Sequence, residues 1–183
     1  MVGVFNKICL KGEMKLNCKI RKWKTEDAYQ LAEALSNKKI MDNLRDGLPF
    51  PYTEDDAKEY INGMLNSDKD QTYAFAIVYE DQVIGSIGVF RKDNIHSKTA
   101  EMGYYIGEPY WGQGHGTNAV IQICELIFKT TDIIRIFAEP FSRNLASCRI
   151  LEKAGFKLEG MLRKNAIKNG QVEDMKLYAL VKE

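Results

Sequence analysis

Histidine is scarce in this chain of 183 residues, which contains only His96 and His115. Zinc sites in proteins are built mainly from histidine and cysteine ligands at short, regular spacings. None of the four cysteines belongs to a C-x-x-C pair: they are Cys9, Cys18, Cys124 and Cys148. We therefore expect no metal, and reduced thiols in a cytoplasmic protein.

The chain also lacks a long apolar run and a charge of one sign. No stretch reaches the roughly 20 residues that a membrane-spanning helix needs, and the first eleven residues are too often interrupted for a secretion signal. Lys and Arg number 26 against 25 Asp and Glu, so the formal net charge is +1. This balance gives no overall attraction to nucleic acid or to an anionic membrane, and we expect a soluble protein that binds neither.

The composition favours one compact domain, because 45% of the residues are apolar and the length is typical of a single core. Residues 1–14 show little periodicity and are interpreted as an N-terminal tail, within which Met14 is a possible second start. The domain is expected over residues 15–183, as a monomer or a homodimer.

Hydrophobic periodicity predicts the elements in chain order. The first half is expected to contain a strand at 18–23, a helix at about 25–36, a short helix and loop at 37–52, a helix from 53 to before 67, and strands at 72–79 and 83–90. The second half is expected to contain a strand at 98–106, a helix after a Gly-rich turn, a strand at 133–138, a helix ending at Gly155, and strands at 156–167 and 171–181. The Asn169-Gly170 pair between the last two strands predicts a tight hairpin.

Three alternating glycines, Gly112, Gly114 and Gly116, stand between a predicted strand and a predicted helix. Backbone N–H groups lack partners at a helix start, and glycine lets the backbone approach an anion closely, so a pyrophosphate is a natural ligand. A P-loop would require Lys-Ser or Lys-Thr after the last glycine, and a dinucleotide-binding fingerprint would require glycine at position 117; Thr117-Asn118 follows instead. A tight turn without a ligand is the plain alternative.

Two segments resemble the GNAT superfamily of N-acetyltransferases. The turn Trp111-Gly112-Gln113-Gly114-His115-Gly116 resembles that family's Gln/Arg-x-x-Gly-x-Gly/Ala element, with tryptophan where Gln or Arg is usual. The run from Asn144 to Phe156 is similar to its second element, with an asparagine near a helix start and a Glu-Lys-x-Gly-Phe ending. The segments 100–104 and 110–112 resemble the ribosomal-protein alanine N-acetyltransferases, the RimJ/RimL-like branch. The resemblance covers the chain from about Lys15 to its end.

The resemblance implies an α+β fold, with a mixed, mostly antiparallel sheet of six or seven strands that is flanked by helices and splayed between its fourth and fifth strands. Acetyl-coenzyme A would lie in that gap as the co-substrate, with the glycine turn on its pyrophosphate and the end of the fourth strand on its pantetheine arm. The residues expected to bind it are Tyr104, Tyr105, Ile106, Trp111, Gly112, Gln113, Gly114, His115, Gly116, Thr117, Asn144 and Ser147. His115 is expected to touch phosphate, ribose or solvent.

Acetyl transfer to an amine needs a proton for the leaving thiolate. Many members of the superfamily place a tyrosine directly before the Glu-Lys of the second element, but that position here is Leu151. Ser147 shares a face of the first helical turn with Asn144 and resembles the serine of RimJ/RimL-like proteins, so it is the candidate acid. The alternative is an ordinary helix-start serine that bonds to the backbone.

The same reaction needs a base for the amine. Glu101 lies on one strand face with Gly103 and Tyr105, beside the implied gap, and is the candidate. The alternative is a strand carboxylate paired to Lys or Arg.

The expected function is therefore N-acetyl transfer from acetyl-coenzyme A to a primary amine, a protein N-terminus or a small amine, by direct attack in a ternary complex. The acceptor is expected between the 37–52 loop, the following helix and the final hairpin. Acidic residues there suit a cationic amine, although acids at a helix start also serve as caps: they are Asp42, Asp46, Glu54, Asp55 and Asp56. A catalytically silent acyl-coenzyme A binding module is the main alternative, and a NAD-binding domain is a third.

Overall fold

The structure is a computed structural model that describes residues 18–183. The predicted tail at 1–14, its possible start Met14, and Cys9 lie outside this range. The strands are β1 (Lys19–Arg21), β2 (Thr72–Tyr79), β3 (Gln82–Arg91), β4 (Thr99–Ile106), β5 (Arg135–Ala138), β6 (Lys157–Lys168) and β7 (Gln171–Val181). The α-helices are α1 (Ala28–Leu35), α2 (Lys38–Met41), α3 (Glu54–Leu65), α4 (His115–Thr130) and α5 (Leu145–Lys153).

All seven strands form one sheet in the order β1-β2-β3-β4-β5-β7-β6. Every neighbouring pair is antiparallel except β4 and β5, which run parallel. This confirms the predicted mixed, mostly antiparallel sheet. Short connections explain the antiparallel pairs β2–β3, β3–β4 and β6–β7, whereas the parallel pair is joined through α4.

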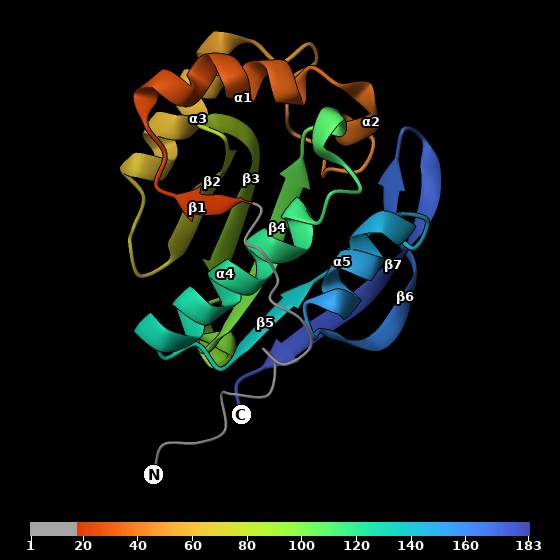
Figure 1. The fold of residues 1–183 in the computed structure, drawn as a ribbon. Helices are drawn as coiled ribbons and strands as arrows, with labels where there is room; N and C mark the ends of the chain where they lie inside the picture. The colour runs from red at the N-terminus through yellow and green to blue at the C-terminus, as the bar shows by residue number, and fades with distance from the viewer. Residues whose placement is uncertain (1–17) are drawn as a thin grey trace.

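The parallel pair is short, and beyond it the two strands diverge (Figure 1). Strand β4 pairs with β5 only from Thr99 to Glu101, where Glu101 lies opposite Phe137. On its other side β4 stays paired with β3 up to Ile106. The two halves of the sheet therefore part after Glu101, as the predicted splay between the fourth and fifth strands requires.

Helices cover both faces of the sheet. Helices α4 and α5 pack on one face, over a core that includes Ile87, Ile123 and Leu151. Helices α1 and α3 pack on the other, over a second cluster that includes Leu31 and Ile61. Alternation along β4 sends Tyr104 toward the first cluster and Tyr105 toward the second, so the two faces of the gap carry different side chains.

Local chemistry explains most boundaries. The β2–β3 turn has positive φ at Glu80 (46°) and Asp81 (64°), and the β6–β7 turn has it at Asn169 (52°) and Gly170 (75°). Such turns match the twist of a hairpin. The first predicted strand, 18–23, shortens to β1, and the strand expected from 133 begins at Arg135. Helix α3 starts at a capping box in which Asp56 N–H donates to Thr53 Oγ1 (3.2 Å) and Thr53 N–H donates to Asp56 (2.8 Å).

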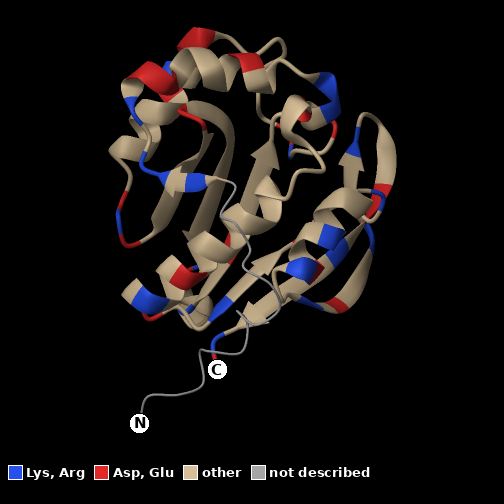
Figure 2. Ribbon diagram, viewed as in Figure 1, with Lys and Arg blue, Asp and Glu red and all other residues tan. Residues whose placement is uncertain are grey.

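Residues of both charge signs are spread over the ribbon (Figure 2), and their totals nearly balance. Among residues 18–183 there is no helix long and apolar enough to cross a membrane. The three cysteines in this range, Cys18, Cys124 and Cys148, are buried free thiols. Burial raises the pKa of the Cys18 thiol to about 11, which makes it a poor nucleophile.

Candidate active site

The glycine turn lies at the open end of the sheet, between the end of β4 and the start of α4. Gly112 (φ 76°) and Gly114 (φ 89°) both adopt the left-handed conformation that favours glycine, and Gly114 is the N-cap of α4. Trp111 to Gly114 are exposed. The turn thus presents backbone at the positive end of a 16-residue helix, which is a favourable place for an anion.

The next residues lie beneath the surface. A Cβ on Gly116 would stand 2.7 Å from Ile150 Cδ1, so this glycine lets α4 and α5 approach closely. Thr117 is also buried. Both were expected to bind the cofactor, and at the start of α4 their backbone remains the part predicted to do so.

His115 corrects the sequence interpretation. Its imidazole is 2% exposed, and its ring centroid lies 4.7 Å from that of Tyr79 and 6.2 Å from that of Tyr110. The side chain therefore belongs to the core and not to the outer surface of the turn, where it was expected to touch phosphate, ribose or solvent. The ring packs against Tyr79 of β2 and against Tyr110, so at the start of α4 this side chain points toward the sheet.

Trp111 occupies the place of the Gln or Arg of the resembled motif. Its indole N–H donates to the carbonyl of Ile106 at 2.6 Å, and the side chain is still 46% exposed. This bond fixes the ring beside the end of β4.

A hydroxyl pair lies on the α5 face of the gap. The Tyr104 and Ser147 hydroxyl oxygens are 2.9 Å apart, and Tyr104 also donates to the Ser147 carbonyl at 3.2 Å. The Asn144 side chain caps α5 by accepting from the Ser147 N–H at 3.1 Å. Burial raises the pKa of Tyr104, so its hydroxyl stays protonated and can donate to Ser147.

The sequence did not predict the contact between the Tyr104 side chain and Ser147, because only the backbone of Tyr104 is assigned to the cofactor there. Strand alternation was the available signal, since it puts Tyr104 on the face opposite Glu101. The position of the usual superfamily tyrosine is filled by Leu151, which is fully buried in the core. The tyrosine hydroxyl near Ser147 thus comes from β4.

A carboxylate pair lies on the opposite face. Glu101 and Glu139 both contact the Arg45 guanidinium, Glu101 in a short hydrogen bond and Glu139 at 3.8 Å. Lys92 Nζ lies 3.5 Å from the other oxygen of Glu101. Glu101 is therefore a strand carboxylate paired to Arg and Lys, as the alternative interpretation anticipated, and it also stands at the residue where β4 and β5 part.

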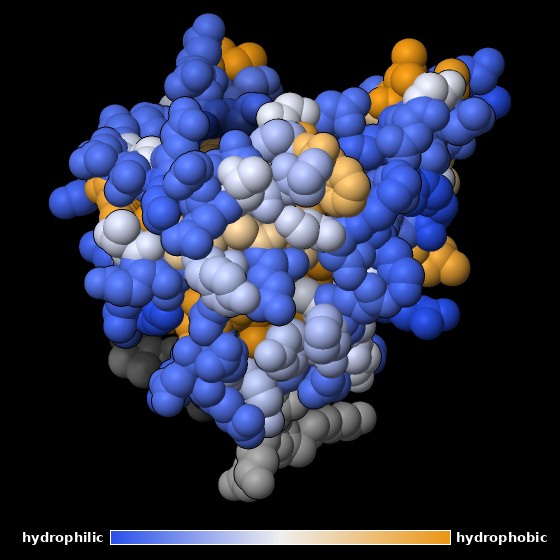
Figure 3. All heavy atoms as spheres, turned by 90° about the horizontal axis from the view of Figure 1, so that it is seen from above, coloured by the Kyte–Doolittle hydropathy of each residue, from blue (hydrophilic) through white to orange (hydrophobic). Residues whose placement is uncertain are grey.

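Space is left between these groups. No atom lies within 4 Å of the position that a Cβ on Gly103 would occupy. A cavity of about 230 Å³ adjoins this face, and its walls include Arg45, Glu139, Phe141 and Met175. Seen from above, weakly polar and apolar residues form a central band between hydrophilic flanks (Figure 3).

The segment from Asp42 to Asp46, which we call the strap, crosses from α2 to the β6–β7 hairpin. Asn169 donates to Asp42 at 2.8 Å, and Lys168 Nζ contacts Asp46 at 2.6 Å. Arg143 donates to the Asp42 carbonyl at 2.8 Å. Figure 1 shows α2 beside the tip of this hairpin. Hydrogen bonds from Lys38 and Asn169 lower the pKa of Asp42, which is thus already paired.

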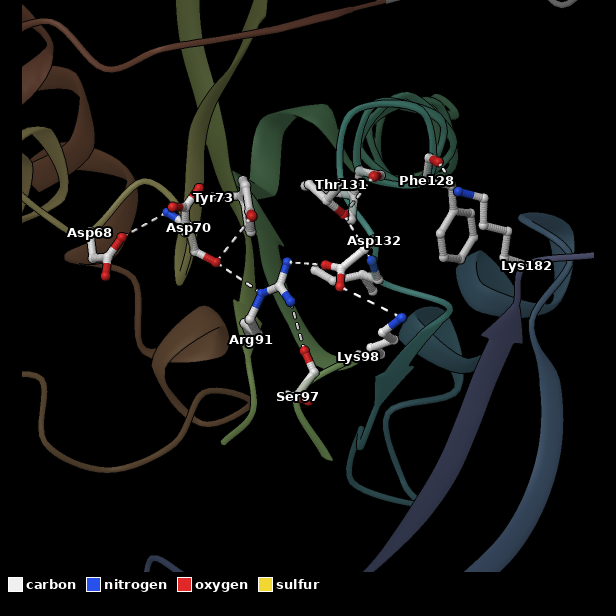
Figure 4. A network of polar contacts seen from close by, with 12 residues as sticks. Asp68, Asp70, Tyr73, Arg91, Ser97, Lys98, Phe128, Thr131, Asp132 and Lys182 are labelled. Carbon is white, nitrogen blue, oxygen red and sulfur yellow. Dashed lines mark hydrogen bonds and ion pairs between the residues drawn. The ribbon is translucent and has the colours of Figure 1, made fainter. Parts of the chain in front are cut away.

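The larger hollow, about 560 Å³, lies at the other end of the sheet. Arg91 ties that end together (Figure 4): it donates to the carbonyls of Asp70 (2.9 Å) and Ser97 (2.7 Å) and to the Asp132 carboxylate (2.8 Å). These partners come from the turn before β2, the β3–β4 loop and the α4–β5 loop. The network accounts for the polar groups of Arg91 and marks this end as structural.

Comparisons with known proteins bear on the family and the fold. Residues 18–157 match the Acetyltransferase (GNAT) domain family. The probable N-acetyltransferase YjcK of Bacillus subtilis is 37% identical over 116 residues, which span 62% of this chain and 64% of that protein, slightly less than two thirds of it. The ribosomal-protein-serine acetyltransferase of Escherichia coli is 28% identical over 72% of this chain and 74% of that protein.

A solved structure of a ribosomal L7/L12 alpha-N-protein acetyltransferase, RimL, in complex with coenzyme A has the same fold. Its TM-score is 0.80 at 20% sequence identity, with 91% of this chain and 94% of that chain covered.

Proposed function

The chain belongs to the GNAT family of acetyltransferases, and from this premise we propose that it transfers the acetyl group of acetyl-coenzyme A to a primary amine. The observation that carries the proposal is the arrangement around one gap. A glycine turn and helix start stand at its mouth, the Tyr104–Ser147 hydroxyl pair lies on one face, and the Glu101 carboxylate lies on the other. An acid and a base on opposite sides of one space suit acyl transfer between two substrates.

Acetyl-coenzyme A fits the α5 face of the gap. Its pyrophosphate would be held by the backbone of Gly112 to Gly114 at the start of α4, as anions are at other helix N-termini. Within the described residues, no strand pairs with positions 102–106 of β4 on the β5 side. Backbone groups along this edge can therefore pair with the amides of the pantetheine arm, and the RimL relative solved with coenzyme A has the same fold.

The proposed reaction uses Glu101 on one face of the gap and Ser147 on the other. The amine nitrogen attacks the thioester carbonyl carbon, so that a C–N bond forms while the C–S bond breaks. The amine proton goes to Glu101, directly or through one water, and the leaving thiolate takes a proton from Ser147, which Tyr104 supports by hydrogen bonding. A backbone N–H at the free edge of β4 stabilises the carbonyl oxygen as its negative charge grows.

The acceptor is proposed to be the free amine of a protein N-terminus or a small amine. The ribosomal proteins named for the Escherichia coli and RimL relatives make peptides with a free N-terminal serine or alanine the first acceptors to test. Spermidine and an aminoglycoside complete the panel. Release of coenzyme A thiol, together with the mass of each acceptor, identifies the product.

The alternative, a catalytically silent acyl-coenzyme A binding module, rests on Leu151 in place of the usual tyrosine. It predicts that acetyl-coenzyme A raises the melting temperature while no acceptor gains an acetyl group. Turnover of any amine in the panel eliminates this alternative.

Replacement of Ser147 tests the acid. We expect Ser147→Ala to lower kcat by about 100-fold or more, because loss of a general acid typically has that effect, while acetyl-coenzyme A still stabilises the variant. Ser142→Ala, in the loop just before α5, is the matched control and should keep wild-type turnover. Unchanged kcat in Ser147→Ala would assign the serine to helix capping alone, and Tyr104→Phe would then test the tyrosine as the proton donor.

A further inference from the structure

Arg45 occupies the position between two carboxylates at the point where the sheet opens. In the parallel register Glu101 lies opposite Phe137, and Glu139 follows Phe137 by two residues, so both glutamates belong to the same face of the sheet. The Arg45 guanidinium contacts both. The two carboxylates keep limited exposure, 18% for Glu101 and 22% for Glu139, whereas the Arg45 side chain is 65% exposed.

Arg45 thus places a positive charge where the acceptor amine is proposed to enter. Two carboxylates facing one space repel each other unless a cation lies between them. Lys92 also neutralises Glu101, at 3.5 Å, but Glu139 is not among its contacts. Arg45 is thus the group that bridges the pair.

Arg45 can leave this position without disturbing the fold. It belongs to the strap, which is anchored on each side of it by other residues: Asp42 is held by Asn169 and Arg143, and Asp46 by Lys168. An exposed ion pair contributes little to stability, because solvent screens it. The guanidinium can therefore swing into solvent while the strap stays attached to the hairpin.

We propose that the Arg45 guanidinium occupies the binding position of the acceptor's ammonium group. A cationic primary amine then binds between Glu101 and Glu139 by displacing this guanidinium. The inference rests on the proposed acetyl transfer and names its substrate class, an amine that arrives as an ammonium ion. The displaced position puts the amine nitrogen against Glu101. The bound ammonium first loses one proton to solvent water, and the neutral amine that attacks the thioester then gives its second proton to Glu101. The walls formed by Phe141 and Met175 in the adjoining cavity suit the apolar part of such an amine.

Arg45 then competes with every acceptor and lowers its apparent affinity. For an ion pair this exposed, the cost corresponds to roughly a two- to five-fold weakening of binding. Removing the guanidinium should strengthen amine binding by that factor, whereas a group needed to hold the acceptor would give the opposite result.

The test is calorimetric titration of the full-length protein with butylammonium, with butanol as the neutral probe of the same shape. We expect Arg45→Gln to bind butylammonium about two- to five-fold more tightly than wild type, with no gain for butanol. Lys92→Gln is the matched control, since it removes a positive charge beside the same Glu101 carboxylate without vacating the bridge. Glu139→Gln in the Arg45→Gln background should abolish the gain.

Unchanged or weaker binding of butylammonium by Arg45→Gln overturns the proposal. An equal gain in affinity in Lys92→Gln also overturns it, because the loss of any positive charge near Glu101 would then explain the effect. Turnover of the amine panel is measured in parallel. If amines are acetylated but Arg45→Gln binds butylammonium no more tightly than wild type, only the proposal that Arg45 occupies the acceptor position fails. If the gain is present but wild type and Arg45→Gln acetylate no amine, the acetyl-transfer function fails while the cation site stands.

Discussion

The β4–β5 pair is pinned at one end and open at the other. At the pinned end, parallel pairing over Thr99–Glu101 and the hydrogen bonds of Arg91 join β3, the β3–β4 loop and the α4–β5 loop. At the open end the strands part after Glu101, and the facing groups belong to the hydroxyl pair, the carboxylate pair and the glycine turn. Secure contacts at one end hold the two halves of the sheet while the other end is left free for substrates.

Glu101 lies at the boundary between the two ends, and its replacement should have the largest effect. We expect Glu101→Gln to lower kcat/KM for the amine by about 10²–10⁴-fold, because a positioned base contributes that much. Glu159→Gln, which removes a carboxylate paired to Arg135 on the other half of the sheet, is the control. Wild-type turnover in Glu101→Gln would leave this carboxylate with a structural role only.

Replacements at the pinned end should lower the melting temperature and leave the KM for acetyl-coenzyme A unchanged. Arg91→Met removes hydrogen bonds from a side chain that is 14% exposed, and we expect its melting temperature to fall by about 4–8 °C. The KM for acetyl-coenzyme A should not change. Lys98→Met, which loses only a 3.9 Å contact with Asp132, should shift the melting temperature by no more than about 1–3 °C. A raised KM in Arg91→Met would show that the two ends are coupled.

The ion pair between Arg91 and Asp132 makes the thermal stability depend on pH, and the pKa shift fixes the direction of that dependence. The hydrogen bond from Arg91 lowers the pKa of Asp132. A carboxylate with a lowered folded-state pKa stabilises the protein above its unfolded pKa of about 3.9, and this contribution disappears as the pH falls through the folded value. The melting-temperature difference between wild type and Arg91→Met should therefore narrow below about pH 4. Thermal unfolding from pH 7 to pH 3 measures it, and a constant difference would contradict the assignment.

A replacement at the open end should change the melting temperature least. Valine at Gly103 meets no atom within 4 Å of its Cβ, and strands tolerate β-branched residues, so the melting temperature should stay within about 2 °C of wild type. The new side chain enters the space beside Glu101 and should raise the KM for the amine. Gly160→Val, at an equally open position in β6, is the control and should leave both quantities unchanged. An unaltered KM in Gly103→Val would place the acceptor elsewhere.

The sequence by itself determined the order of the elements, the hairpin turns, the glycine turn and the family. These features depend on local chemistry: strand and helix periods, left-handed residues such as Gly112 and Asn169, and caps such as Thr53. The splay between the fourth and fifth strands was also predicted correctly, through the family resemblance. The cofactor and catalytic assignments remain predictions, and the structure corrects only the expected position of the His115 side chain.

Only the tertiary structure decided which groups meet in the gap. Tyr104 and Ser147 are 43 positions apart, and Arg45 and Glu101 are 56 apart, so no periodic pattern links them. Their contacts depend on sheet order and on the register of β4 with β5, which are set by packing over the whole domain. For the same reason His115 is buried: helix α4 begins at this residue, and its position over the sheet decides where the ring points.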